Sequence, residues 1–415
     1  MRHDFKTVCV VGMGYIGLPT AATLATRGLS VVGLEVSQEV VNTINKGMIH
    51  IVEPELDVLV KGSVNAGKLK ATTVPEPADA FIIAVPTPLT GNNEPDTSFI
   101  EDAVDSIAPV LEKGNLIILE STSPIGTTER IVSRVAELRT DLHIPRSRNA
   151  AGDLYFVHCP ERVLPGKIIG ELVDNDRVIG GFTPDSAERA ADLYGIFVRG
   201  KLLLTDDKTA EMTKLVENAY RDVNIAFANE LSLICDELQI NVWSVIDFAN
   251  RHPRVNILKP GPGVGGHCIA VDPWFIVSAS PRQARLIATA RQVNDSKPGF
   301  IVEKVLNVAE KFKKPVVACL GLSYKADIDD LRESPALEIA KVLAERCSGK
   351  LLIVEPFIKQ LPDEITGEAV QLVDFGEALD QADIVVLLVD HKQFKMVDRE
   401  KLQQKIVIDI KGYWR

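Results

Sequence analysis

Val8-Cys9-Val10-Val11-Gly12-Met13-Gly14-Tyr15-Ile16-Gly17 is the stretch that decides the fold of this chain. Its apolar first half predicts a buried parallel strand, and its glycines have the spacing G-x-G-x-x-G that joins such a strand to a helix. Gly12 allows the tight turn, Gly14 lets the backbone approach a pyrophosphate, and Gly17 lets the helix pack against the strand. A tight turn without a ligand would use the same glycines, so the motif needs support from its surroundings.

A second predicted strand, Val31–Leu34, supplies that support because it ends at Glu35. An acid at about this interval accepts hydrogen bonds from the ribose hydroxyls of a dinucleotide. The following residues, Val36-Ser37-Gln38, include no arginine for a 2′-phosphate, which favours NAD over NADP. Strand, glycines, second strand and acid in register therefore predict an NAD site.

Length and composition are typical of an ordinary enzyme. The 415 residues exceed one core and predict two or three domains, and the net charge of −11 argues against nonspecific binding of nucleic acid. The six cysteines lack a C-x-x-C pair or the spacing of a disulfide framework, which predicts reduced thiols and a cytoplasmic location. The N-terminal residues are too polar and the first strand too short for a signal peptide or membrane span, so we expect no membrane partner.

The order of apolar runs predicts an α/β fold. In the first half, short apolar runs alternate with helical patterns and favour a doubly wound parallel sheet. Helical patterns over 207–238 and 242–250 predict a central helical region with a long connecting helix, and the alternation returns after Lys313. We therefore expect an N-terminal Rossmann domain (1–206), a central helical domain (207–313) and a C-terminal Rossmann-like domain (314–415).

Cys268 stands directly after the glycine-rich loop Gly261–Gly266 and His267. A buried cysteine is usually a small hydrophobe, but this loop offers little apolar bulk to bury one. A dehydrogenase with its own thiolate can capture an aldehyde and continue to the acid, which predicts a four-electron oxidation. Zinc binding by His158-Cys159 and His267-Cys268 is the competing use; adjacent side chains diverge, so we expect no metal.

Several polar residues could belong to a site or to the surface. Lys214, Asn218 and Arg221 share one helical face, where they could hold an oxyanion or form a solvated charged stripe. The loops 85–88 and 120–128 follow predicted strands at the edge where ligands of open sheets bind, although Pro, Ser and Thr also favour plain turns.

The motifs together are similar to those of the UDP-glucose/GDP-mannose dehydrogenases. The motifs that carry this resemblance occur in the family's order along essentially the whole chain: the glycine fingerprint, Val85-Pro86-Thr87-Pro88, Glu120-Ser121-Thr122, Pro160-Glu161-Arg162, Glu211–Asn218 and Gly265-Gly266-His267-Cys268. Within the family, Arg251–Asn256, Asp272–Phe275 and Lys411–Arg415 resemble the members that oxidise UDP-N-acetylmannosamine at C6. Those members supply the uronate for bacterial surface polysaccharides such as enterobacterial common antigen. UDP-N-acetylglucosamine and UDP-glucose stay open as substrates.

The resemblance also implies roles for individual residues and a homodimer formed across the central helices. The residues it places in catalysis are Cys268 as nucleophile, Lys214 as acid/base, Asn218 and Asp272 as charge or water partners, and Glu161 and Thr122 near the hydrolytic water. The residues it places at NAD, beside the three glycines, are Tyr15, Ile16, Glu35, Thr87, Thr128 and Arg332. The residues it places at the nucleotide sugar are Arg162, Val163, Lys214, Asn218, Arg221, His252, Arg254, Gly265, Tyr324, Lys325 and Lys411. Many family members have Asp where this chain has Glu35, and the longer side chain affects NAD affinity rather than the hydroxyl-accepting role.

Two hypotheses that assign a different kind of function to the protein remain open. A noncatalytic sensor of NAD or nucleotide sugars would keep the fold and form no NADH. A two-electron hydroxyacid dehydrogenase would need no thiol and would form one NADH per substrate.

Overall fold

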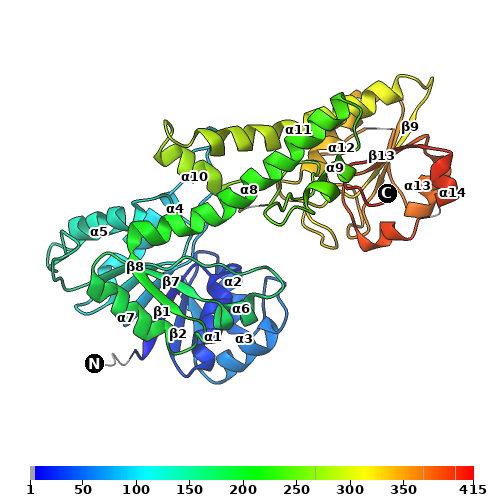
Figure 1. The fold of residues 1–415 in the computed structure, drawn as a ribbon. Helices are drawn as coiled ribbons and strands as arrows, with labels where there is room; N and C mark the ends of the chain where they lie inside the picture. The colour runs from blue at the N-terminus through cyan, green and yellow to red at the C-terminus, as the bar shows by residue number, and fades with distance from the viewer. Residues whose placement is uncertain (1–4, 267, 368, 398) are drawn as a thin grey trace. The chain divides into compact units, whose positions relative to one another are not determined.

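The computed structural model describes residues 5–266, 268–367, 369–397 and 399–415. Its backbone contacts divide the chain into two units. Unit 1 holds the residues up to 217 together with 274–280, and unit 2 holds residues 218–273 and 281–415. The expected α/β fold is confirmed: strands from the N-terminal half of the sequence form one sheet, strands from its C-terminal part form another, and a run of helices comes between them in the sequence (Figure 1).

Unit 1 is built on an eight-stranded sheet in the order β3-β2-β1-β4-β5-β6-β7-β8. Its strands are β1 (Thr7–Val11), β2 (Ser30–Leu34), β3 (Leu69–Thr72), β4 (Ala80–Ile83), β5 (Leu116–Leu119), β6 (Tyr155–His158), β7 (Arg177–Gly181) and β8 (Leu202–Asp206). Its helices are α1 (Gly17–Thr26), α2 (Gln38–Asn45), α3 (Leu56–Asn65), α4 (Ser98–Ile107), α5 (Thr127–Leu138), α6 (Ile168–Asp174) and α7 (Pro184–Tyr194), with a 3-10 turn at Ala108–Val110. Two apolar clusters, one around Val8, Val10 and Ile82 and one around Cys9, Phe81 and Ile83, form its core.

The sheet of this unit is parallel, as expected, except at one pair of strands. β6 and β7 are antiparallel, with Val157 opposite Gly181 and His158 opposite Gly180. Their connection, residues 159–176, carries the seven-residue helix α6, and β7 enters the sheet in the reverse direction. The other paired strands of this sheet are parallel.

In the described part of the chain, four helices follow β8 before the next strand: α8 (Asp207–Glu237), α9 (Val242–Ala249), α10 (Asp272–Ala279) and α11 (Arg285–Ala309). Of the helices described, α8 and α11 are the two longest. The helical patterns predicted over 207–238 and 242–250 agree with α8 and α9 to within one residue. Among the described residues, no helix combines the length and apolarity that a membrane crossing requires.

Unit 2 contains a five-stranded parallel sheet in the order β11-β10-β9-β12-β13. Its strands are β9 (Val316–Leu320), β10 (Lys350–Val354), β11 (Val370–Leu372), β12 (Ile384–Leu387) and β13 (Ile406–Asp409), and its remaining helices are α12 (Pro335–Arg346), α13 (Phe375–Gln381), η2 (Lys392–Lys395) and α14 (Arg399–Gln403). The central strands β9, β10 and β12 consist almost entirely of buried Val, Ile, Leu, Ala and Cys, as expected for a sheet covered on both faces.

Candidate functional site

The turn between β1 and α1 requires its first and third glycines and leaves room at the second. Gly12 has φ +88°, and a Cβ there would lie 2.8 Å from the Ala84 carbonyl oxygen. A Cβ at Gly17 would lie 1.8 Å from the Gly12 oxygen, whereas one at Gly14 would meet no described atom within 4 Å. Gly14 therefore faces open space that a pyrophosphate can enter, beside the N-terminal amides of α1.

Glu35 completes this turn from the end of β2. Its Oε2 accepts a hydrogen bond from the Met13 N–H at 3.0 Å, and its Oε1 accepts one from the Ser37 N–H at 3.1 Å. The side chain is half-buried, so each oxygen keeps lone-pair capacity for a ribose hydroxyl. Tyr15 is 45% exposed beside the half-buried Ile16. The cradle and its acid fit the phosphate and ribose groups of NAD.

The two threonines predicted to contact NAD have different surroundings. Thr87 keeps a buried hydroxyl that has no hydrogen-bond partner among the described residues. The Thr128 hydroxyl instead donates to Glu211 Oε1 at 2.7 Å, and the Thr128 and Gly126 amides donate to the same carboxylate. Burial raises the pKa of Glu211, whose carboxylate caps the first turn of α5. Both hydrogen-bond donors of Thr128 are therefore used within the protein, and its hydroxyl oxygen keeps the capacity to accept.

Glu161 lies in a buried charge network that the sequence did not reveal. Arg177 Nη1 lies 2.6 Å from Glu161 Oε2 and 3.7 Å from Glu120 Oε1, and the Tyr194 hydroxyl donates to Glu120 at 2.7 Å. Burial raises the pKa of Glu120 to about 7. The guanidinium therefore orients the Glu161 carboxylate. Thr122 is half-buried in the loop that follows β5.

Lys214 lies near the buried end of β6. Both His158 ring nitrogens are buried without a hydrogen-bond partner among the described residues. Burial and, to a smaller extent, the nearby positive charge of Lys214 lower the pKa of His158 to about 3, so this imidazole stays neutral. Arg162 pairs with Glu217 at 2.8 Å and is followed by the half-buried Val163.

Three predicted catalytic residues of unit 2 form one cluster. The exposed Cys268 begins a turn in which its carbonyl oxygen accepts the Asp272 N–H at 2.9 Å. Asp272 is 3% exposed, and its Oδ2 accepts a hydrogen bond from Asn218 Nδ2 at 2.6 Å. The cluster thus combines an accessible thiol with a buried carboxylate and its amide partner. His267 lies outside the described residues.

The glycine-rich loop before this turn packs against two predicted substrate residues. A Cβ at Gly265 would lie 2.8 Å from the Tyr324 Cβ, and one at Gly266, where φ is +81°, would lie 3.0 Å from Tyr324 Cε2. Lys411 Nζ lies 3.9 Å from the position of a Cβ at Gly261. The loop needs glycine at positions 265 and 266 because Tyr324, and at Gly265 also the Glu333 carbonyl oxygen 2.4 Å away, leave no room for a Cβ.

Other predicted ligand residues of unit 2 are exposed side chains that a ligand can reach: Arg221, His252, Arg254, Lys325 and Arg332. Arg332 forms an ion pair with Asp330 at 2.6 Å, and the Arg254 amide donates to His252 Nδ1 at 3.4 Å. Across the described part of the chain, no group of three or more His, Cys, Asp or Glu could hold a metal ion.

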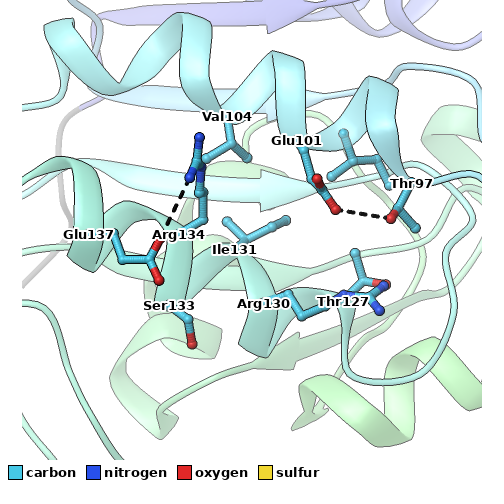
Figure 2. Close-up of a pocket in the computed structure, with 10 residues that line it drawn as sticks. Thr97, Glu101, Val104, Thr127, Arg130, Ile131, Ser133, Arg134 and Glu137 are labelled. Atoms are coloured by element: carbon cyan, nitrogen blue, oxygen red, sulfur yellow. Dashed lines mark hydrogen bonds and ion pairs between the residues drawn. The ribbon is translucent and has the colours of Figure 1, made fainter.

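A surface pocket of about 210 Å³ lies elsewhere, between α4 and α5 (Figure 2). Its floor includes Ile131, while Glu101 at its rim accepts a hydrogen bond from Thr97 at 3.2 Å. Arg134 pairs with Asp105 at 2.6 Å and with Glu137 at 3.5 Å. These charged groups are satisfied within the protein, so the pocket carries no functional assignment.

Comparison with known proteins agrees with the geometry of both units. Residues 6–198 match the NAD binding domain of the UDP-glucose/GDP-mannose dehydrogenase family, residues 208–296 match its central domain, and residues 318–415 match its UDP binding domain.

The chain is similar over its whole length to individual members. It is 59% identical to an NDP-N-acetyl-D-galactosaminuronic acid dehydrogenase from Ralstonia nicotianae, over 99% of this chain and 97% of that protein. It is 57% identical to a UDP-N-acetyl-D-mannosamine dehydrogenase from Yersinia pestis, over 99% of this chain and 100% of that protein. A solved structure of a UDP-D-ManNAc dehydrogenase from Pyrococcus horikoshii has a TM-score of 0.86 at 38% identity, covering 99% of this chain and 96% of that one. NAD is therefore the cofactor, and the chain belongs to the UDP-glucose/GDP-mannose dehydrogenase family.

Proposed function

We propose that this enzyme oxidises the C6 alcohol of UDP-N-acetylmannosamine to the carboxylate, with Cys268 as the nucleophile. The observation that carries the proposal is the exposed Cys268 thiol at the start of a turn that also holds the Asp272–Asn218 pair. An accessible thiol beside polar groups suits covalent capture of an aldehyde, whereas a simple alcohol dehydrogenase needs no such residue.

The chemistry requires two oxidations and one hydrolysis. Two NAD molecules, bound one after the other at the glycine turn, would each accept the hydride of one oxidation. Lys214 takes the proton of the C6 hydroxyl in the first, and the Cys268 thiolate then adds to the aldehyde carbon to form a thiohemiacetal. Loss of the second hydride from that carbon leaves a thioester, and water cleaves its C–S bond to release the acid and restore the thiol. The Asn218 amide and Lys214 would stabilise the oxyanions, and Asp272 would orient Asn218.

The remaining predicted residues would bind the hydrolytic water, the cofactor or the nucleotide sugar. Glu161, oriented by Arg177, and Thr122 would place the hydrolytic water. Residues that would hold NAD beside the glycines are Tyr15, Ile16, Glu35, Thr87, Thr128 and Arg332. Residues that would hold the nucleotide sugar are Arg162, Val163, Arg221, His252, Arg254, Gly265, Tyr324, Lys325 and Lys411.

UDP-N-acetylmannosamine is our first candidate for the substrate, because two relatives are named as dehydrogenases of this sugar nucleotide. One is 57% identical over its full length, and the other is the solved structure with a TM-score of 0.86. An NDP-linked N-acetylgalactosamine is the second candidate, supported by the relative at 59% identity. Sugar epimers differ by the position of one or two hydroxyl or acetamido groups, so a few contacts decide between them. The product, a sugar-nucleotide uronate, would serve the synthesis of surface polysaccharide.

We also propose a three-domain division at 1–206, 207–313 and 314–415 and a homodimer formed through α8. Tyr220, Phe227 and Ile234 form an apolar stripe along this helix and are 73%, 56% and 47% exposed in the single chain, and Leu238, directly after the helix, is 60% exposed. Exposed aromatic residues at intervals of seven suit pairing with a second helix.

The test is the number of NADH molecules formed per molecule of UDP-N-acetylmannosamine consumed. We expect two, with lower kcat/KM for UDP-N-acetylgalactosamine, UDP-N-acetylglucosamine and UDP-glucose. Cys268→Ser should abolish acid formation while NAD still binds. The control is Cys347→Ser, which alters a half-buried cysteine elsewhere and should still form two NADH molecules per substrate.

The other outcomes separate the alternatives. A ratio of one NADH, or undiminished acid formation by Cys268→Ser, would remove the thiol from the reaction. Two NADH with preference for another sugar would keep the mechanism and change the substrate. No NADH with any nucleotide sugar would favour a noncatalytic sensor.

A further inference from the structure

The second sheet repeats the turn-and-acid arrangement of the first. Gly321 follows β9 with φ +90°, as Gly12 follows β1 with φ +88°. At the end of β10, Glu355 Oε2 accepts the Leu322 N–H at 2.7 Å and its Oε1 accepts the Phe357 N–H at 3.2 Å. In each unit, an acid at the end of the second strand therefore binds the amide after the turn glycine and the amide two residues beyond itself.

The acid of the second sheet differs in being closed off by His391. Glu355 is only 4% exposed, and its Oε2 accepts the Ser323 N–H at 3.1 Å in addition to that of Leu322. The fully buried His391 ring places Nε2 3.1 Å from the same oxygen. Because the Asp327 backbone N–H donates to Nδ1 at 2.9 Å, the ring proton must sit on Nε2 and point at Glu355. This acid is thus committed to the protein and cannot serve a ribose as Glu35 can.

The Glu355–His391 pair holds both ends of one short segment, residues 322–327. Glu355 binds the amides of Leu322 and Ser323 at its start, and His391 binds the amide of Asp327 at its end. Between these anchors lies Tyr324, whose ring packs on the glycine-rich loop, followed by the exposed Lys325. The Ser323 hydroxyl further closes the segment by donating to the Lys325 carbonyl oxygen at 2.7 Å.

We propose that His391 is a positioning residue for nucleotide-sugar binding: together with Glu355 it fixes the segment 322–327, so that Tyr324 and Lys325 meet the UDP moiety preorganised. The proposal rests on the proposed function, in which these two residues hold the nucleotide sugar. A loop that is already ordered loses little conformational entropy when the ligand binds. Loss of this preorganisation therefore weakens the affinity for the ligand without altering the reacting groups.

The surroundings of His391 allow its hydrogen bonds to be removed without opening a cavity. Its ring lies between Phe357 and Phe394, with centroids 5.2 Å and 5.4 Å away. A phenylalanine at position 391 would therefore fit among aromatic neighbours while losing both hydrogen bonds. Phe394→Leu is the matched control, because Phe394 is equally buried and contacts His391 but donates no side-chain hydrogen bond to the segment.

The experiment measures UDP and NAD binding by calorimetry and steady-state kinetics in the full-length protein. For His391→Phe we expect the UDP Kd and the KM for the UDP-sugar to rise about tenfold or more, as for the loss of one or two buried hydrogen bonds. The NAD Kd and kcat at saturating sugar should stay within about twofold. His391→Asn, whose side-chain oxygen can still accept the Asp327 N–H, should recover part of the affinity.

Several results would overturn the inference. These are unchanged UDP affinity in His391→Phe, an equal loss in Phe394→Leu, or a parallel loss of NAD binding. If His391→Phe does not fold, His391→Asn and His391→Gln, which each retain one of the two hydrogen bonds, decide through the same UDP titration. If the wild type binds UDP but forms no NADH with any sugar, the proposed function fails, while weakened UDP binding in the variants still supports the role of His391.

Discussion

At the scale of single residues, the cysteines divide into one accessible thiol and several buried ones. Burial raises the pKa of Cys9, Cys159 and Cys319 to about 12, so these thiols are both covered and protonated at neutral pH. Cys268 is exposed, and Cys347 is half-buried. Reactivity with an electrophile should therefore report the candidate nucleophile almost selectively.

We predict that iodoacetamide at about pH 7.5 modifies Cys268 first, because alkylation needs an accessible thiolate. Peptide mass spectrometry at increasing times should show Cys268 modified well before Cys347, and NADH formation should fall in step with Cys268 modification. Full modification of Cys268 with activity intact would contradict the role of this thiol. The Cys268→Ser variant should show no early modified peptide.

At the scale of elements, α8 and α11 meet through buried polar groups rather than through an apolar seam alone. Arg291 pairs with Asp222 at 2.6 Å, and Asn294 donates to Asp222 at 2.8 Å. Asn229 donates to Asn294 at 2.9 Å and also accepts the Gly261 N–H at 2.9 Å. The polar network therefore fixes the register of the two helices and anchors the start of the loop that leads to Cys268.

Lys297 of α11 destabilises the folded chain, because its charged ammonium is buried between the two helices. Burial lowers its pKa from the ordinary 10.5 to about 8, although its ammonium donates to the Ser232 hydroxyl. Below about pH 8 the lysine is charged in both folded and unfolded chains, so folding bears the full cost of burying the charge. Between about pH 8 and pH 10.5 the folded lysine loses its proton first, and its unfavourable contribution disappears.

Lys297→Met should therefore raise the free energy of unfolding by roughly 1–3 kcal/mol near pH 7, and this gain should shrink as the pH approaches about 10. Urea denaturation of both proteins across this pH range measures the difference. Lys311→Met, which changes an exposed lysine just after the same helix, is the control and should show no such gain near neutral pH. If Lys297→Met does not raise the free energy of unfolding at pH 7, or if its stabilising effect grows with pH, this account is contradicted.

At the scale of the whole molecule, the sequence predicted the framework and the loop residues but not the pairings between distant side chains. Central strands such as β1 and β9 were predictable because strands buried on both faces are continuous apolar runs. β8 was missed because it lies at the edge of its sheet and exposes Leu203 and Leu204.

The side-chain pairings that support the candidate site were missed for a related reason. Arg177 and Glu161, or His391 and Glu355, are brought together only by tertiary packing, and no local motif marks either pair. Cys268 and the glycines of both turns were predictable because their local backbone requirements are written in adjacent residues. The residues proposed to touch ligands were therefore visible in the sequence, whereas the side chains paired with them became visible only in the structure.

Assembly is the remaining property at this scale, and the apolar stripe on α8 makes it testable. Leaving Tyr220 and Phe227 exposed to water is unfavourable for a single chain, and a second copy would bury both. We expect light scattering after gel filtration to give twice the mass of one chain for the wild type. Phe227→Asp should give the single-chain mass, because an antiparallel pair centred near this residue would bury two carboxylates opposite each other.

The control for this prediction is Met396→Asp, which places the same charge at a side chain that is 88% exposed in unit 2 and lies outside α8. It should leave the mass at twice that of one chain. A wild type that elutes as a single chain, or a Phe227→Asp variant that keeps the doubled mass, would show that α8 does not form the interface. Because the stripe lies on the helix that also carries Asn218, which donates to Asp272, separation into single chains should also lower kcat if the interface steadies that helix.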